Sequence, residues 1–460
     1  HTPGVERRAG AGLAQGEVGV DDGLGRVLQP QTPEAERDGG ERTDEQEQTV
    51  CRAARGDGVG WGKPPTAVKL IPLSLAVCLL SVSSLSAAPE GVRLSLNARL
   101  RYEDVHQSGL RDGTAFTLRT RLGLSPEPFH GWTALLEAEN IVAFDGDRYS
   151  QAGLNPGGAG RAVVSDPTGT EINQAWVAFT RGQTTATLGR QRLVLDNARF
   201  VGDSGWRQNM QTFDAVRVQD KSLENTVLTY AWLDRINRVL GDRHAQGYWQ
   251  SNSHLFNASY AGFAAGTITG YAYLFDFRSA AASSCATYGA SFAGATPVAR
   301  ALKLAYRAEI AGQTDYGSSA LDYAATYYLL ELGLTAKAGG LTLGHEVLGA
   351  DNGVGFKTPL ATLHAFNGWA DLFPATPAAG LRDTYLKGSA NLPGDLKVLV
   401  GHHWFTADRS GPAPGREFDL QVLRKFGPRL TALFKYANFR RSAAAYPDVQ
   451  KVWAQAEFAY

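Results

Sequence analysis

Apolar and polar residues alternate along most of the chain after residue 91. In VRLSLNARLRYEDV, every second residue from Leu94 to Tyr102 is apolar, and the residues between them are polar or basic. The same alternation occurs in AFTLRTRLGL at 115–124 and in LKLAYRAEI at 302–310. Because successive side chains of a β-strand point to opposite faces, this period of two predicts strands with one apolar and one polar face.

Segments of this kind, each roughly ten residues long, follow one another almost to the last residue. Short turns alternate with longer connections at 144–170, 192–212, 236–250 and 351–381. Such alternation is typical of outer-membrane barrels, whose short turns face the periplasm and whose long loops face outward. We therefore predict an all-β fold, a single closed antiparallel transmembrane β-barrel of about 18 strands, with about 16 as the alternative because bacterial barrels favour even numbers.

The first and last predicted strands are expected to pair with each other and close the barrel. In lipid an open strand edge leaves backbone groups without partners, so the strand at Leu94–Tyr102 should pair with the strand at Val452–Tyr460. The chain ends on Phe458-Ala459-Tyr460, which resembles the terminal signal read by the barrel assembly machinery. A secreted β-sandwich or solenoid would also alternate, but aromatic residues at predicted strand ends, such as Trp132 and Trp404, favour the interface girdles of a membrane barrel.

A different pattern precedes the first strand. Lys69 is followed by an apolar run that begins at Leu70 and by small residues that end at Ala88. This is the layout of a secretory signal peptide, so we assign 68–88 to a signal that is cleaved between Ser86 and Ala88.

Residues 1–67 are rich in Gly, Glu, Arg and Gln and show no apolar periodicity. Such a segment cannot bury enough apolar surface to fold. We expect it to be disordered or to be a spurious upstream extension, with Val68 as the start of the protein; the alternative is a genuine disordered extension before an uncleaved anchor. Residues 89–460 then form the barrel.

Composition narrows the function classes. The chain has 52 Gly, 20 Phe, 17 Tyr and 9 Trp, and no uncharged apolar run after the signal is long enough for a spanning helix. Its formal net charge is zero and it lacks a basic cluster interleaved with aromatic residues, so no nucleic-acid partner is expected. Cys285 alone follows the signal, which leaves no disulfide within the barrel.

Motifs for catalysis and for metal binding are missing from the sequence. His345, His364 and the pair His402-His403 are not spaced as metal ligands, and neither HExxH nor a Gly-x-Ser-x-Gly elbow occurs. We expect no metal, no cofactor and no enzymatic activity. Two alternatives remain: a barrel enzyme of the lipase or protease kind with a Ser/His/Asp site assembled in space, and a closed structural or adhesive barrel.

Basic residues of the predicted strands fall on the face opposite the apolar one. A charge that faces lipid at the membrane midplane costs about 2–4 kcal/mol, so these side chains should face the lumen, where clustered cations favour anions. The alternative is that they pair with carboxylates across the wall, such as Glu139 or Glu417, and only brace it. The candidate pore-lining and selectivity residues are Arg93, Arg99, Arg101, Arg119, Arg121, Arg190, Lys303, Arg307, Glu309 and Lys397.

Four of these residues, Arg99, Arg101, Arg119 and Arg121, belong to two adjacent predicted strands. They should form one basic wall patch. Few carboxylates lie on the same two strands, so the patch is expected to keep an unbalanced positive potential and to give the pore a preference for anions.

Charged residues also cluster in and beside the connection at 192–212. These candidates for a constriction loop that folds into the lumen are Asp196, Arg199, Trp206, Arg207, Asp214 and Arg217. The alternative is a clip that merely fixes the loop.

The stretch TLGRQRLVLDNARFVGDSGWRQNMQTFDAVRV resembles the alginate-export family of outer-membrane proteins. The matching residues are Gly189, Arg190, Gln191, Asp196, Arg199, Trp206, Thr212, Phe213 and Asp214. A second stretch, HAFNGWADLFPATPAAGLRDTYL, resembles another element of the family at Gly368, Ala370, Asp371, Gly380, Leu381 and Asp383.

This resemblance implies a porin-like barrel in the bacterial outer membrane, surrounded by lipid and lipopolysaccharide. It further implies passage of small polar solutes, anionic or sugar-like, with polysaccharide export as a variant. The resemblance covers the layout of the whole barrel but only these two stretches in detail, and no residue points to alginate itself.

Overall fold

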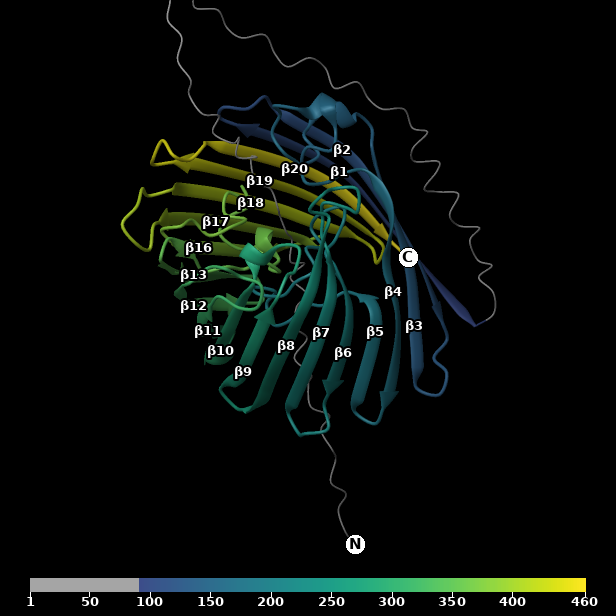
Figure 1. Cartoon of the computed structure of the whole chain (residues 1–460). Helices are drawn as coiled ribbons and strands as arrows, with labels where there is room; N and C mark the ends of the chain where they lie inside the picture. Colours follow the sequence, from purple (N-terminus) through teal and green to yellow (C-terminus); the bar gives the residue numbers. More distant parts are fainter. Residues whose placement is uncertain (1–90) are drawn as a thin grey trace, which may run out of the picture. The chain divides into compact units, whose positions relative to one another are not determined.

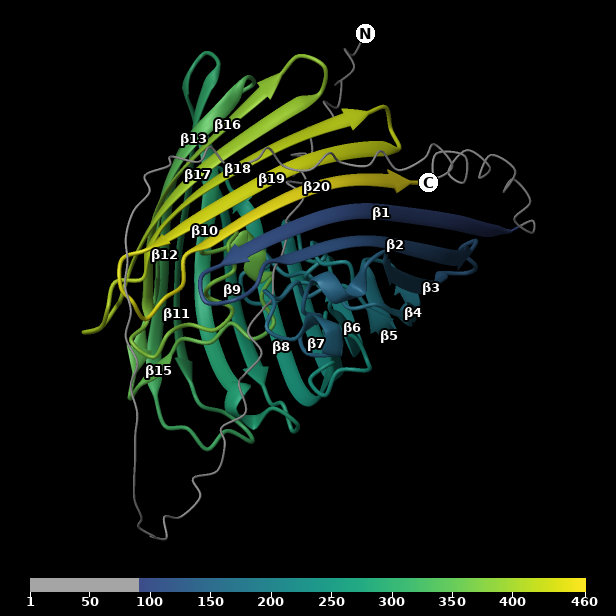
Figure 2. The ribbon, with the colours of Figure 1, turned by 90° about the horizontal axis from the view of Figure 1, so that it is seen from above.

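The computed structural model describes residues 91–460, which form a closed β-barrel (Figure 1). Its 18 antiparallel strands make one continuous sheet. The sheet closes because β1 (Val92–Gln107) pairs with both β2 (Gly113–Pro126) and β20 (Val449–Ala459), and Figure 2 shows β1 beside β20. The predicted all-β fold, the count of 18 and the pairing of the first strand with the last are confirmed, and the alternative count of 16 is wrong.

The remaining barrel strands follow in chain order. They are β3 (Trp132–Ala143), β4 (Gly169–Arg181), β5 (Thr184–Gln191), β6 (Thr212–Asp220), β7 (Thr226–Asn237), β8 (Tyr248–Phe263), β9 (Gly266–Phe275), β10 (Cys285–Ala299), β11 (Leu302–Thr314), β12 (Ala324–Ala336), β13 (Gly339–Leu348), β16 (Leu381–Leu392), β17 (Leu396–Thr406), β18 (Gly415–Phe426) and β19 (Leu430–Arg441). The connections contain the short pair β14 (Ala350–Asp351) and β15 (Val354–Gly355) and the 3-10 turns η2 (Gly146–Arg148), η3 (Pro156–Gly158), η4 (Ala281–Ser283) and η5 (Leu363–Ala365).

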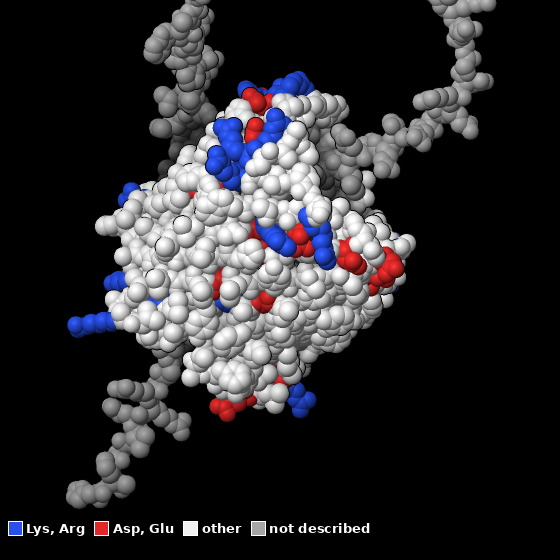
Figure 3. All heavy atoms as spheres, turned by 90° about the vertical axis from the view of Figure 1, so that its left-hand side faces the viewer, with Lys and Arg blue, Asp and Glu red and all other residues white. Residues whose placement is uncertain are grey.

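Side chains alternate between the outer surface and the interior as the sequence predicts. On β2, Leu122 and Leu124 are exposed on the outside, whereas Arg119 and Arg121 are buried inside. Ile310 on β11 is 66% exposed, although it is strongly apolar. Large areas of the side shown in Figure 3 carry no Lys, Arg, Asp or Glu. A closed barrel with such an exterior spans a membrane, so the chain is an outer-membrane protein.

Connections of different length lie at opposite ends of the barrel. One end carries short turns such as 182–183 and 264–265, and the other carries the long segments 144–168, 192–211 and 349–380. The short-turn end also holds the junction of the terminal strands, where the Tyr460 amide donates to the Leu96 carbonyl at 2.8 Å.

The signal peptide at 68–88 and the extension at 1–67 lie outside the described residues. Within 91–460, no helix is long and apolar enough to cross a membrane, a finding that does not bear on crossing by strands.

Candidate constriction of the channel

Two long connections fold into the barrel and meet there. We call 192–211, between β5 and β6, the first loop, and 349–380, between β13 and β16, the second loop. Val201 and Leu360 form an isolated parallel bridge, and the Gly202 amide donates to the Leu360 carbonyl at 2.8 Å. A Cβ atom on Gly202 would lie 2.1 Å from Oγ1 of Thr362, so only glycine permits this approach of the two backbones.

The start of the first loop also depends on a glycine. Gly189, near the end of β5, has φ +117°, and a Cβ there would lie 2.3 Å from the Ala175 carbonyl on β4. This close approach explains the glycine of the Gly-Arg-Gln motif. Next to it, Nε of Arg190 donates to Oδ1 of Asp214 at 2.7 Å and Nη2 donates to Oδ2 at 3.0 Å, which joins the end of β5 to the start of β6.

Apolar side chains pack the first loop against β9 and β12 of the barrel wall. Phe200 is buried between Tyr271 of β9 and Tyr327 of β12, with ring centroids 5.4 and 5.2 Å away. Phe356 of the second loop completes the contact at 6.0 Å. Burial of such rings contributes on the order of 1.5–3 kcal/mol each, so the loop is packed like a protein core.

Arg199 anchors the same loop by charge. Its Nε donates to Oε1 of Glu346 on β13 at 2.7 Å, and its Nη2 donates to Oδ1 of Asn367 in the second loop at 3.0 Å. Arg199 and Glu346 are both almost fully buried. The negative charge of Glu346 raises the pKa of Arg199 against the opposing effect of burial, so the cation persists at this depth.

Arg207 joins the first loop both to the wall and to the second loop. It lies 3.2 Å from Glu103 on β1 and 3.2 Å from Asp371 in the second loop. Asp371 also accepts from Nζ of Lys451 on β20 at 2.6 Å. Although burial opposes ionisation, these cations lower the pKa of Asp371, and the carboxylates raise the pKa of Arg207.

His364 completes this contact from the second loop. Lys435 of β19 donates from Nζ to Nε2 of His364 at 2.5 Å, and Nδ1 of His364 lies 2.7 Å from Asp371. An ammonium group can only donate, so Nε2 must accept and the proton of a neutral imidazole lies on Nδ1. Burial and then the Lys435 charge lower the pKa of His364, and the ring stacks on Trp206 at 4.9 Å.

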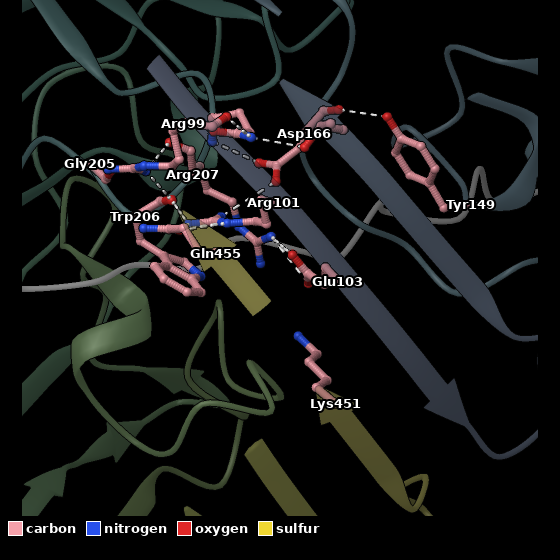
Figure 4. A network of polar contacts seen from close by, with 12 residues as sticks. Arg99, Arg101, Glu103, Tyr149, Asp166, Gly205, Trp206, Arg207, Lys451 and Gln455 are labelled. Carbon is pink, nitrogen blue, oxygen red and sulfur yellow. Dashed lines mark hydrogen bonds and ion pairs between the residues drawn. The ribbon is translucent and has the colours of Figure 1, made fainter. Parts of the chain in front are cut away.

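The wall arginines predicted from the sequence hold the tip of the first loop (Figure 4). Arg99 donates to the carbonyls of Gly205 at 2.9 Å and Trp206 at 2.8 Å. Arg101 donates to the Trp206 carbonyl at 2.6 Å, and its guanidinium lies 3.7 Å from the centroid of the Trp206 ring. Nη2 of Arg121 donates to the Gln208 carbonyl at 3.4 Å.

Carboxylates from other parts of the chain pair with this patch. Arg99 and Arg119 lie 3.0 and 3.2 Å from Glu457 on β20. Arg101 lies 3.5 Å from Asp166, and Arg121 bonds Glu139 on β3. The expectation that few carboxylates offset the patch is therefore wrong, since three carboxylates pair with its four arginines. It considered only the carboxylates of β1 and β2, whereas barrel closure and the connection at 144–168 supply the partners.

The other predicted residues are spread over the barrel. Arg93, Lys303 and Lys397 are exposed towards the short-turn end, outside the constriction. Arg307 lies 2.6 Å from Glu309 on its own strand, β11. Asp196 accepts from Asn257 at 2.9 Å and Tyr273 at 3.2 Å, and Arg217 is half-buried on the inward face of β6 beside its register partner Thr187.

Sequence reasoning did not predict that wall carboxylates hold the second loop. It named Glu417 only as a possible partner of the wall cations and Asp383 only as a residue of the family resemblance. Asn367 donates to Glu346 at 2.7 Å and to Asp383 on β16 at 3.2 Å, and the Ala370 amide donates to Glu417 on β18 at 2.6 Å. The inward positions of Glu346, Asp383 and Glu417 on their strands could have indicated such contacts, because a buried charge needs a partner. Among residues 91–460, no group of three or more His, Cys, Asp or Glu side chains is arranged to hold a metal ion.

Comparison with known proteins gives a match to one family model. A family model described as alginate export matches residues 91–235, which include β1–β6, the first loop and most of β7. Residues 91–235 of this porin-like barrel are thus similar to the alginate-export family. The resemblance seen in the sequence is thereby confirmed, whereas no curated protein matches the chain.

Solved structures share the fold of this barrel. Pseudomonas aeruginosa OccK1 (OpdK) is 14% identical with a TM-score of 0.64, over 81% of this chain and 99% of that one. OpdK with vanillate gives 14% and 0.65 over the same shares. Acinetobacter baumannii OccAB4 gives 10% and 0.62, over 80% of this chain and 98% of that one.

Proposed function

We propose that this barrel is a channel that passes small polar solutes, preferentially anionic or sugar-like, through a lumen narrowed by the two loops. The observation that carries the proposal is the ion pair between Arg207 and Asp371, which joins the loops inside a closed membrane-spanning barrel. Loops fixed by buried charge and packed rings define a constriction of set shape, as a selective channel requires.

Cations that face the lumen support a preference for anions. Arg217 has an inward, half-buried side chain on β6, and none of the ion pairs formed among residues 91–460 involves it. Arg307 adds a second inward cation, although Glu309 offsets its charge. A structural relative, OpdK, has been solved with vanillate, a small aromatic carboxylate, which supports a small anion as the solute.

The long-loop end is proposed to face outward and the short turns to face the periplasm, as in other outer-membrane barrels. Lipid and lipopolysaccharide would then surround the barrel wall, with lipopolysaccharide at the long-loop end. The barrel assembly machinery is proposed to read the terminal strand with Phe458 and Tyr460, since β20 closes the barrel on β1.

Transport is supported over catalysis because alginate export, by which the family is described, is itself transport. Export of a polysaccharide is the second candidate, and it would require the two loops to part. Single-channel recording in a planar bilayer, with reversal potentials under a salt gradient, tests both candidates. Small discrete conductances with anion preference support the proposal. A barrel that never conducts would instead favour a structural, adhesive or enzymatic role, which hydrolase assays separate.

A further inference from the structure

Two arginines lie side by side on the outer surface at the long-loop end of the barrel. Arg416 on β18 and Arg440 on β19 are direct partners in the strand register. Their chain neighbours Glu417 and Phe439 are fully buried in the interior. Since side chains alternate along a strand, Arg416 and Arg440 point outward, and both are exposed.

The neighbouring strands show that this pair lies near the membrane boundary. Trp404 on β17 is the register partner of Arg416, faces the same outer surface and is 45% exposed. Tryptophan at a strand end marks the interface between hydrocarbon and headgroups. Arg382, at the start of β16, is exposed on the same side.

The charges of this rim do not balance. Within 91–460, Asp408 pairs with Arg382 at 3.0 Å and lies 3.6 Å from Arg409, and Asp448 lies 3.8 Å from Arg441. These ion pairs leave Arg416 and Arg440 facing each other without a carboxylate. Like charges directly opposite on paired strands destabilise a sheet, and an anion between them would remove that repulsion.

We propose that Arg416 and Arg440 bind the phosphate groups of lipopolysaccharide in the outer leaflet. This rests on the proposed orientation, which places the long-loop end in that leaflet. Guanidinium groups match phosphate with paired, charge-assisted hydrogen bonds. Trp404 then lies against the boundary between the phosphorylated sugars and the acyl chains, which suits its apolar ring and its polar N–H group.

The test compares the double variant Arg416→Gln/Arg440→Gln with the full protein and with Arg424→Gln. Arg424 is the matched control, because it has the same outward phase at the opposite end of β18 and is also exposed. The proteins are placed in neutral-lipid nanodiscs, and binding of purified lipid A, of its dephosphorylated form and of inorganic phosphate is measured by native mass spectrometry. Heat-modifiable gel mobility confirms folding, and Arg440→Gln alone replaces the double variant if that variant does not fold.

The double variant is expected to bind lipid A about tenfold more weakly, a change of about 1.4 kcal/mol. Arg424→Gln should bind like the full protein, and dephosphorylated lipid A should bind the full protein as weakly as lipid A binds the double variant. The proposal is overturned by unchanged binding in the double variant, by an equal loss in Arg424→Gln, or by equal binding of the dephosphorylated lipid. Displacement of lipid A by inorganic phosphate at equal concentration would show a site for free phosphate instead. Conductance in a bilayer without lipopolysaccharide should be the same in all three proteins. A barrel that does not conduct would overturn the channel proposal without affecting the measurement of lipid A binding.

Discussion

Arg207 of the first loop lies 3.2 Å from Asp371 of the second loop, in a position where both side chains are almost fully buried. This ion pair connects segments that lie far apart in the sequence. Each partner has a second contact with the wall, Arg207 with Glu103 and Asp371 with Lys451. Loss of either partner therefore leaves an uncompensated charge in the interior rather than simply removing one contact.

Arg207→Gln should destabilise the loop assembly strongly. Removing one partner of a buried pair costs on the order of 3–5 kcal/mol, because the remaining charges lose their counter-ion. We expect larger and noisier single-channel currents, since the loops lose the ion pair that joins them at this point, and a lower midpoint in denaturant unfolding.

Arg192→Gln is the matched control for this change. Arg192 lies in the same loop and pairs with Asp203, but its side chain is 53% exposed. Asp203 is buried, but it keeps a hydrogen bond from the Gly205 amide at 3.2 Å when Arg192 is replaced. The loss of stability should therefore be smaller than for Arg207, and the currents of this variant should stay quieter. Equal noise in both variants would contradict the role of the buried pair.

Arg101 allows charge to be separated from geometry. It both donates to the Trp206 carbonyl and stacks on the Trp206 ring. Arg101→Lys keeps the charge but loses the planar guanidinium. We expect increased gating noise with an unchanged reversal potential, measured in the same bilayer. A shifted reversal potential with quiet currents would mean that Arg101 acts on permeating ions rather than on the loop.

Acidic solution should loosen the second loop. The folded protein depresses the pKa of both His364 and Asp371. A group whose pKa is lower in the folded protein than in the unfolded chain contributes stability that is complete above its unfolded pKa. That contribution is lost as the pH falls towards its folded pKa. The unfolded pKa is about 6.5 for histidine and about 3.9 for aspartate. Stability should therefore decline below about pH 6.5 and decline further below about pH 4.

His364→Gln tests the first of these steps. Glutamine can still donate to Asp371 and accept from Lys435, but it does not titrate. In this variant the unfolding midpoint should no longer fall as the pH drops from near neutral. It should still fall at the lower pH where Asp371 is protonated. An unaltered pH profile from about 7 to 5 would contradict this assignment to histidine.

The architecture was accessible from the sequence because strand alternation is a local signal. Leu122 and Arg121 are adjacent in the chain and reach opposite faces of β2 in any barrel of this kind. Closure also followed from physics alone, since an open edge in lipid is too costly.

Pairing of the charges inside the barrel was not accessible in the same way. Glu457 reaches Arg99 and Arg119 only because β20 closes against β1. Asp166 reaches Arg101 from a long connection whose path no periodic pattern describes. Sequence reasoning therefore identified the arginines of the wall correctly as inward-facing but gave them too large a net charge.

Selectivity should consequently depend on inward cations that lack a carboxylate rather than on the wall patch. Arg217 meets this condition: it faces inward on β6, between the register partners Thr187 and Ala231, which are uncharged. Its positive field should raise the local concentration of anions in the lumen. Arg217→Gln is expected to shift the reversal potential towards cations at low salt, and the shift should shrink as salt rises, because exposed charges are screened over about 8–10 Å at physiological ionic strength. Arg93→Gln removes an exposed charge outside the constriction. This variant should change the reversal potential far less. If the two variants behave alike, or if Arg217→Gln leaves the reversal potential unaltered at low salt, Arg217 does not set the ion preference of the pore.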